Sequence, residues 1–330
     1  IKTILDSSNQ PNNLGRERCS FDILSNPEFL AEGTAINDLK YPERVLIGGE
    51  NKQAIQALID IYKRWVPIEK IISTNTWSSE LSKLVANAFL AQRISSINSI
   101  SALCEVTGAD IKEVASAIGF DSRIGKKFLN SGPGFGGSCF KKDILNLVYL
   151  SKQLGLPSVA NYWEGVLKIN KWQQHRISRI IIEKLFGTIS AKKISILGFS
   201  FKANTNDTRE SASISVCKDL LSEGALLSIH DPKVNSSQVE KDLEDFTSSE
   251  DETFLSERRR SNLGKWEFTN NMEEVFEGSD AVVVLTEWSQ YSEIKWENVV
   301  SKMRAPAWVF DTRSILNSES VIISGINYLS

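Results

Sequence analysis

The sequence predicts an α/β protein in which a long central helix joins two doubly wound domains, the first of them incomplete. Three observations predict this: strand-like and helical runs precede residue 75, a long helical period follows, and strands alternate with helices after residue 192. A chain of 330 residues exceeds what one ordinary core supports. We therefore expect domains at residues 1–75, 76–185 and 186–330.

The first region combines short strands with a helix. Strand-like runs occur at residues 21–24 and 44–47, and a helical pattern covers residues 51–65. Apolar residues then recur at helical spacing over residues 76–107, until Gly108 ends the pattern. The sequence thus predicts the end of an α/β domain followed by a long helix.

The middle of the chain is predicted to be helical around one glycine-rich loop. A short helix is expected over residues 110–118, the loop over 131–138, and a helix over 140–154. A further helical pattern covers residues 158–185, either as one helix or as a broken one.

The last region alternates strands with helices, which predicts a second doubly wound parallel sheet. Its strand-like runs are residues 194–197, 226–229, 281–285 and 308–310. We interpret the polar stretch at residues 236–262 as a surface excursion. Its basic triplet, Arg258 to Arg260, follows acidic residues that cancel its field, which favours a solvated loop over a nucleic-acid patch.

The composition excludes several classes of protein. Hydrophobic residues make up 41% of the chain and charged residues 24%, as in ordinary globular proteins. A net charge of −3 supplies no broad cationic field for nucleic acid or a membrane. No apolar run approaches the length of a membrane span. The chain begins at Ile1, without a methionine and within an element, so we expect that an N-terminal portion is missing.

The cysteines are scattered without paired spacing, so the sequence suggests neither a disulfide framework nor a zinc site, and we expect no bound metal. A reducing, cytoplasmic location is the expectation that follows. The four positions are Cys19, Cys104, Cys139 and Cys217.

Cys139 is the candidate nucleophile. It follows a run of glycines at a predicted helix start, where unpaired N–H groups favour a thiolate, and Lys141 and Lys142 add positive potential. Asp143 lies four residues later, on the same helix face, where it can hold or activate a water. The alternative is a buried structural cysteine. The preceding glycines and the following charges favour the nucleophile.

The glycines before Cys139 match the sequence pattern of a dinucleotide-binding loop but not its structural context. Residues 132–137 read G-x-G-x-x-G, but the segment before them is basic and not strand-like. A loop that lets the backbone approach a ligand closely suits these glycines better.

Three other segments place polar residues where function concentrates. Lys83 and Asn87 share one face of the long helix, and Glu28 and Glu32 follow a strand. Residues 198–210 occupy the first strand-to-helix crossover of the last sheet, where phosphates bind in such folds. An exposed lysine and solvated glutamates are the alternatives.

Together these segments resemble the UDP-glucose dehydrogenase family, within the sugar-nucleotide dehydrogenases, over essentially the whole chain. The family's N-terminal glycine fingerprint is absent from this sequence. The resemblance implies two Rossmann-like domains, the remnant of an NAD-binding domain and a UDP-sugar-binding domain, joined by a central dimerisation and catalytic region. The segments that carry it are Asn26 to Gly33, the helix with Lys83 and Asn87, Phe135 to Phe140, and Asp207 to Glu210.

The resemblance also implies a four-electron oxidation. The sugar's primary alcohol loses a hydride to NAD, while Lys83 and a water held by Asp143 accept the proton and stabilise the oxyanion that Asn87 orients. The Cys139 thiolate attacks the resulting aldehyde, and a second hydride transfer gives a thioester. Water activated by Glu28 or Asp143 then releases the acid.

By the same resemblance, Glu32, Lys142 and Arg209 would contact NAD. Arg123 would reach the sugar site of a neighbouring subunit, which implies a dimer or a higher homo-oligomer. The positions that would contact UDP-glucose are Phe29, Leu30, Asn130, Gly132, Gly134, Phe135, Gly136, Phe201, Lys202 and Arg313.

Two alternatives remain open on sequence. One is a sister enzyme for another sugar nucleotide, derived from N-acetylmannosamine or GDP-mannose. The other is an inactive fragment that only binds UDP-sugar and self-associates.

Overall fold

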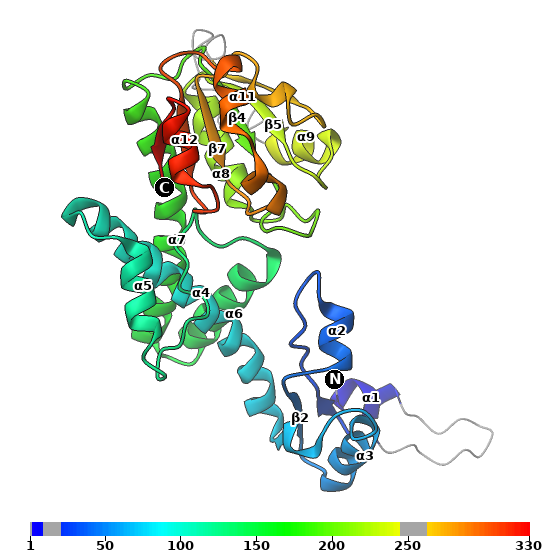
Figure 1. Ribbon diagram of the computed structural model, residues 1–330. Coiled ribbons are helices and arrows are strands. Elements are labelled where there is room, and N and C mark those ends of the chain that lie inside the picture. Colours follow the sequence, from blue (N-terminus) through cyan, green and yellow to red (C-terminus); the bar gives the residue numbers. More distant parts are fainter. Residues whose placement is uncertain (1, 9–20, 245–262) are drawn as a thin grey trace, which may run out of the picture. The chain divides into compact units, whose positions relative to one another are not determined.

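The structure is a computed structural model that describes residues 2–8, 21–244 and 263–330. It divides into two compact units, residues 1–87 and 88–330 (Figure 1). The first contains a three-stranded sheet and the second a six-stranded sheet. The helices, including short 3-10 turns labelled η, are α1 Lys2–Ser8, α2 Ala35–Lys40, α3 Lys52–Tyr62, η1 Ile68–Lys70, α4 Thr76–Thr107, α5 Ile111–Gly119, α6 Ser138–Gln153, α7 Pro157–Lys184, α8 Ala212–Ser222, α9 Ser236–Glu244, η3 Glu274–Phe276, η4 Ser289–Glu293, α11 Trp296–Val299, η5 Val300–Lys302 and α12 Ser318–Ile323.

The sheet of the first unit forms around one buried strand. The order is β1 Leu24–Ser25, β2 Val45–Gly49 and β3 Ile71–Thr74, with β1 antiparallel and β3 parallel to β2. All five residues of β2 are buried, and helix α3 packs against them. The strands and helix expected before residue 75 are therefore present, together with β3, which the sequence did not indicate.

Helix α4 spans Thr76–Thr107, the range expected from its helical period. Gly108 follows it with φ of 77°, a conformation that suits glycine at a helix end. Residues 76–87 of α4 belong to the first unit and residues 88–107 to the second. Helix α7 is continuous, with Pro157 at its first turn, so the possible break in residues 158–185 does not occur.

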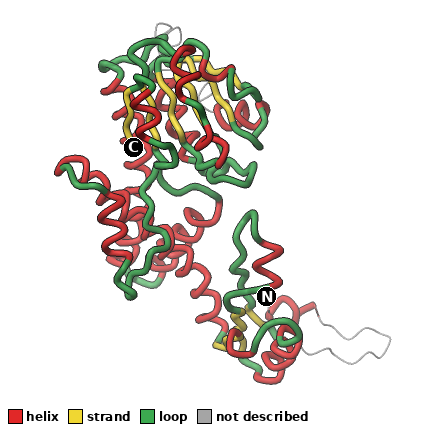
Figure 2. The backbone as a smooth tube through the Cα atoms, viewed as in Figure 1, coloured by secondary structure: helices red, strands yellow, loops and turns green. Residues whose placement is uncertain are grey.

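The larger sheet has the doubly wound topology expected from the sequence. Its spatial order is β6-β5-β4-β7-β8-β9, and all neighbouring strands are parallel. The strand order therefore reverses between β4 and β7, and ligands of such sheets bind beyond the strands' carboxyl ends at such a point. Figure 2 shows these strands side by side among helices. Their bounds are β4 Lys193–Leu197, β5 Leu226–His230, β6 Lys265–Phe268, β7 Ala281–Val284, β8 Trp308–Asp311 and β9 Asn327–Leu329.

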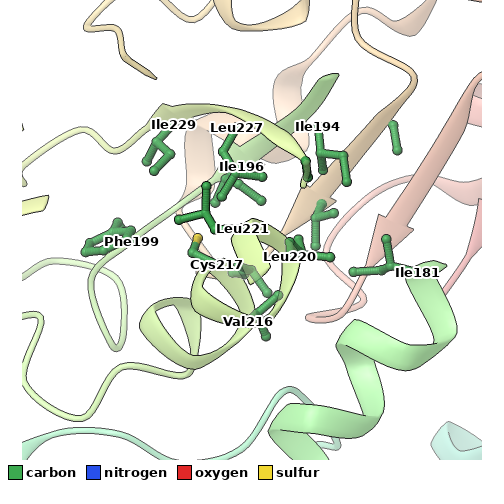
Figure 3. Packing of buried hydrophobic residues seen from close by; sticks show 14 of the residues in the cluster. Ile181, Ile194, Ile196, Phe199, Val216, Cys217, Leu220, Leu221, Leu227 and Ile229 are labelled. Atoms are coloured by element: carbon green, nitrogen blue, oxygen red, sulfur yellow. The ribbon is translucent and has the colours of Figure 1, made fainter. Parts of the chain in front are cut away.

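Both faces of this sheet are buried, because successive strand residues point to opposite sides. On one face, Ile194 and Ile196 pack with Ile181 of α7 and with the apolar stripe of α8 (Figure 3). On the other, Val282 and its neighbours pack with residues of η4, α11 and α12. The near-continuous apolar runs that marked these strands in the sequence follow from this two-sided burial.

The polar stretch at residues 236–262 is not wholly a surface excursion. Residues 236–244 form helix α9, and its Val239 and Leu243 are buried in the core of the larger sheet. The apolar pair lies four residues apart on one helix face, a spacing hidden among polar neighbours. The remainder of the stretch, with its basic triplet, lies outside the described residues.

The described residues contain neither a candidate membrane-spanning helix nor a candidate metal site. None of the helices in residues 2–8, 21–244 and 263–330 combines the length and apolar character that crossing a membrane requires. Within the same ranges, no three side chains among His, Cys, Asp and Glu gather in a way that could hold a metal ion.

Candidate active site

The first unit brings Glu28, Phe29 and Lys83 together. The Lys83 amine lies 3.9 Å from the Glu28 carboxylate and 5.5 Å from the centre of the Phe29 ring. Glu28 also accepts a hydrogen bond from the Leu30 N–H, at 2.6 Å, and the Arg44 guanidinium stacks over Phe29 at 4.0 Å. The loop after β1 thus presents a carboxylate and an aromatic ring to a lysine of α4.

A pocket of about 360 Å³ lies beside this group and is lined by Glu28, Phe29 and Leu30, with residues from α2 and β2. Asn87 follows Lys83 by one turn of α4 and is half-buried. Glu32 is exposed. The predicted residues of this unit therefore fall on two elements, one loop and one helix.

Cys139 is the second residue of α6, and its side chain is exposed. Gly137 precedes the helix with φ of 80°, and Asp143 lies buried one turn after the cysteine. Lys141 forms an ion pair with Glu210 at 2.8 Å, so a carboxylate offsets its charge, whereas Lys142 is exposed. The predicted nucleophile is accessible at a helix start, but only part of the expected positive charge is unopposed.

The glycines before α6 fit closely against the crossover after β4. A side chain at Gly136 would place its Cβ 2.6 Å from the Glu210 carbonyl oxygen, and the Gly137 N–H donates to the Arg209 carbonyl at 2.9 Å. The Phe135 ring packs edge to face on Phe140. The glycines therefore allow a close backbone approach, here to the chain itself.

The opposite side of the same loop is held by an amide clamp, which we define as Asn98 of α4 with Asn170 and Gln173 of α7. The Gly132 N–H donates to Asn98 at 2.9 Å, and Gln173 donates to the Gly132 carbonyl at 3.0 Å. The Phe135 N–H donates to Asn170 at 2.8 Å, and Asn170 donates back to the Phe135 carbonyl at 3.0 Å. All three amides are buried. The sequence did not indicate these three amides, because no local pattern marks a helical amide that bonds to a distant loop.

The crossover after β4 uses its first backbone donors internally. The N–H groups of Phe199 and Ser200 donate to the Asp231 carboxylate at 2.7 and 3.0 Å, and the Trp288 indole donates to the same oxygen at 3.2 Å. These donors are therefore engaged by the protein rather than open to a phosphate. The phosphate site that the fold suggests would have to rely on later groups of the crossover, such as Lys202.

Arg313, at the carboxyl end of β8, reaches this crossover. It donates to the carbonyls of Leu285 at 2.8 Å and Phe201 at 3.4 Å, and it lies 3.2 Å from the Glu287 carboxylate. Burial lowers the pKa of Arg313, and Glu287 opposes that shift. Lys202 lies 5.5 Å from the Phe201 ring centre. Phe201, Lys202 and Arg313 are thus neighbours, and their assignment to substrate binding stays a prediction.

A second pocket, of about 430 Å³, is lined by Asn130 and Arg313 together with Lys112 and Lys126. Arg123 is close to Asn130 in sequence but does not line this pocket. Its side chain is 88% exposed and forms an ion pair with Asp121, and this pair raises the pKa of Arg123. The pocket thus combines two predicted substrate positions with two lysines that the sequence analysis did not name.

Comparison with family models decides the affiliation of the chain. Three models of the UDP-glucose/GDP-mannose dehydrogenase family match it in order: the NAD binding domain over residues 1–66, the central domain over 77–172 and the UDP binding domain over 195–318. The UDP-glucose 6-dehydrogenase of Pongo abelii is 54% identical over 321 residues, or 96% of this chain. The chain belongs to the UDP-glucose/GDP-mannose dehydrogenase family.

Other members of the family confirm the relationship. The UDP-glucose 6-dehydrogenase of Caenorhabditis elegans is 54% identical over 92% of this chain. The solved UDP-glucose dehydrogenase of Pyrobaculum islandicum superposes with a TM-score of 0.78 at 29% identity and covers 94% of this chain and 63% of its own. This chain spans about 62% of the length of both curated relatives.

The predicted catalytic residues fall into two groups, one in each unit. Glu28, Lys83 and Asn87 lie in the first unit, and Cys139 and Asp143 lie in the second. Each group is internally consistent with a site. The domain bounds and the individual roles inferred from the sequence stay predictions.

Proposed function

We propose that this chain carries the catalytic and UDP-sugar-binding parts of a cytoplasmic UDP-glucose 6-dehydrogenase, which oxidises UDP-glucose to UDP-glucuronate through a thioester on Cys139. The observation that carries the proposal is the exposed Cys139 at the start of α6, one turn before the buried Asp143, in a chain 54% identical to proteins of that activity. A thiol in this position is accessible and can attack the carbonyl carbon of a bound substrate.

The residues act in the order that the chemistry requires. Lys83 and a water held by Asp143 take the proton of the C6 hydroxyl and stabilise the developing oxyanion, and departure of a hydride from C6 leaves the aldehyde. The Cys139 sulfur then adds to the C6 aldehyde and forms a thiohemiacetal. Loss of its C6 hydride and its hydroxyl proton leaves a thioester, and water, activated by Glu28 or Asp143, releases the acid and restores the thiol.

NAD supplies the hydride acceptor of both oxidations when it is bound. The residues present fit such a dinucleotide, because Lys142 and Arg209 are exposed cations on segments that meet at the start of α6, and an ion pair with Asp207 at 2.6 Å holds Arg209 in place. Cations of this kind suit the pyrophosphate. Glu32, in the first unit, is an exposed carboxylate suited to a hydroxyl or amide of the cofactor.

A homodimer is the proposed working unit. Apolar side chains of α4 and of the segment after α5 are exposed in the single chain, including Leu103, Val106 and Phe120. Burial of such apolar surface between two copies of the chain would drive self-association. Arg123, in the same region, extends into solvent in the single chain, as a residue that reaches a neighbour's sugar site would. Sedimentation of a folded monomer at micromolar concentration would contradict this.

Isothermal titration tests the proposed function. The chain is titrated with UDP-glucose and with NAD, in parallel with a chimera in which the N-terminal part of a full-length relative precedes it. UDP-glucose binding to both, with turnover by the chimera, is the expected result. A folded chimera that binds neither ligand would refute the proposal.

A further inference from the structure

We infer that the amide clamp, Asn98, Asn170 and Gln173, positions the backbone of residues 132–135 for a sugar nucleotide. The inference rests on the proposed function for the identity of the ligand and on the hydrogen bonds for the role of the clamp. It adds to the site three residues that touch neither the reacting carbon nor the thiol.

The clamp fixes both ends of the loop. Both backbone polar groups of Gly132 and both of Phe135 bond to buried amides. Between them, Pro133 has no N–H and a restricted φ. A segment without regular structure thereby obtains a defined shape from two long helices, α4 and α7.

Gly134 is fitted to the clamp. Its φ is 115°, and a Cβ added there would lie 2.8 Å from the Asn170 side-chain oxygen. Only glycine combines this backbone conformation with so close an approach. The loop and the clamp are therefore complementary at the scale of single atoms.

The clamp is not what packing alone would favour. Asn98 and Gln173 each keep one buried polar atom without a hydrogen-bond partner among the described residues. An unpaired buried polar atom destabilises the folded state, whereas an apolar side chain of similar size would pack there without that loss. The amides are thus better explained by the bonds they make to the loop than by stability.

The loop leads directly into the nucleophile. Phe135 is followed by Gly136 and Gly137, and the N–H of Gly137 is already tied to the Arg209 carbonyl. The bonds of Phe135 to the clamp and of Gly137 to Arg209 together fix the chain as it enters α6, two residues before Cys139. The clamp connects the shape of the substrate loop to the position of the thiol.

Asn170→Ala and Gln173→Ala test the inference. The first removes two hydrogen bonds to the loop backbone, and the second removes one. Gln174→Ala is the matched control, since Gln174 is a buried amide on the same helix that packs against Gly134 without bonding the loop backbone. Amide hydrogen exchange of peptides covering residues 131–138 and titration with UDP-glucose are measured on the full chain. We expect exchange about tenfold faster for Asn170→Ala, from the value of a buried hydrogen bond, a smaller rise for Gln173→Ala, and parent behaviour for the control.

The outcomes separate the two proposals. Faster loop exchange with affinity for UDP-glucose at least several-fold weaker in Asn170→Ala or Gln173→Ala, and parent behaviour of Gln174→Ala, supports the clamp as positioning residues. Unchanged exchange, or faster exchange at unchanged affinity, overturns it. A parent chain that does not bind UDP-glucose refutes the proposed ligand, while the exchange rates still decide whether the clamp holds the loop. If Asn170→Ala does not fold, Gln173→Ala carries the test.

Discussion

The amine of Lys83 lies 3.9 Å from the carboxylate of Glu28, at the outer limit of an ion pair. The pair is formed by a helix and a loop that lie more than fifty residues apart in sequence, and Lys83 is mostly buried whereas Glu28 is mostly exposed. A lysine held at this distance is oriented without being neutralised by close contact. That arrangement suits a cation that must stabilise charge arising on a bound ligand.

Lys83→Ala should therefore suppress the first hydride transfer in the chimera with an N-terminal extension. Loss of the cation removes stabilisation of the developing oxyanion, a loss of about a hundredfold or more by analogy with oxyanion-hole donors. Glu80→Ala, at an exposed position one turn earlier on α4, is the control and should keep parent rates. Stopped-flow measurement of NADH formation distinguishes them. A Lys83→Ala rate within threefold of the parent would remove Lys83 from the mechanism.

A matched pair of glycines tests the close approach at the substrate loop. Gly136→Ala should destabilise the chain by about 1–3 kcal/mol, as overpacking does, because its Cβ would lie 2.6 Å from a backbone oxygen. Gly165→Ala, inside α7 with open space around it, should instead stabilise by roughly 0.5–1 kcal/mol through helix propensity. Urea unfolding measures both. Equal effects of the two substitutions would contradict the described loop.

Much of this fold was predictable because local signals were strong. The long α4 has a sustained apolar period and a terminal glycine, and the strands β4, β5, β7 and β8 are apolar enough to be buried on both faces. Cys139 was placed at a helix start because glycines precede it and charged residues follow.

What the sequence did not reveal depends on tertiary context. The edge strands β6 and β9 have only four and three residues, so even the regular alternation of β6 is too short to stand out. The amide clamp and the Lys141–Glu210 pair are contacts between segments far apart in the chain, which no local pattern encodes. Helix α9 was hidden because only two of its side chains are buried.

Leu243→Ala tests the burial of α9 in the core. Deleting a fully buried leucine side chain leaves a cavity and should cost about 2–5 kcal/mol of stability. Glu240→Ala, on the exposed side of the same helix, should change stability by no more than about 0.5 kcal/mol. Thermal unfolding of both variants is sufficient. A Leu243→Ala variant as stable as the parent would mean that residues 236–244 do not pack as described.

The stability of the larger unit should fall in mild acid because of His230. Burial lowers the pKa of His230 below its ordinary value of 6.5, and Asp231 only partly opposes this. Below that ordinary value the unfolded chain binds a proton that the folded chain does not, so the free energy of unfolding decreases as pH falls, by at most about 1.4 kcal/mol per pH unit. Above it, His230 is neutral in both states and contributes no slope.

His230→Gln should flatten this acid dependence, although loss of the 3.0 Å contact with the Tyr291 hydroxyl lowers stability at every pH. Urea unfolding between pH 7.5 and 5, on parent and variant, separates the constant offset from the slope. An identical slope in both proteins would show that His230 is not the titrating group.

Cys139→Ser distinguishes thioester chemistry from ordinary alcohol oxidation. The serine oxygen can still add to the aldehyde, and a second hydride loss gives an ester in place of a thioester. An alkoxide leaves far less readily than a thiolate when water attacks the acyl carbon, so turnover should stop after capture. Lys83→Ala, by contrast, should stall before any adduct forms. Mass spectrometry of the chimera incubated with UDP-glucose and NAD should therefore show a sugar-nucleotide acyl adduct on the peptide containing position 139 in Cys139→Ser alone. Multiple turnovers by that variant without an adduct would make Cys139 a bystander and refute the mechanism.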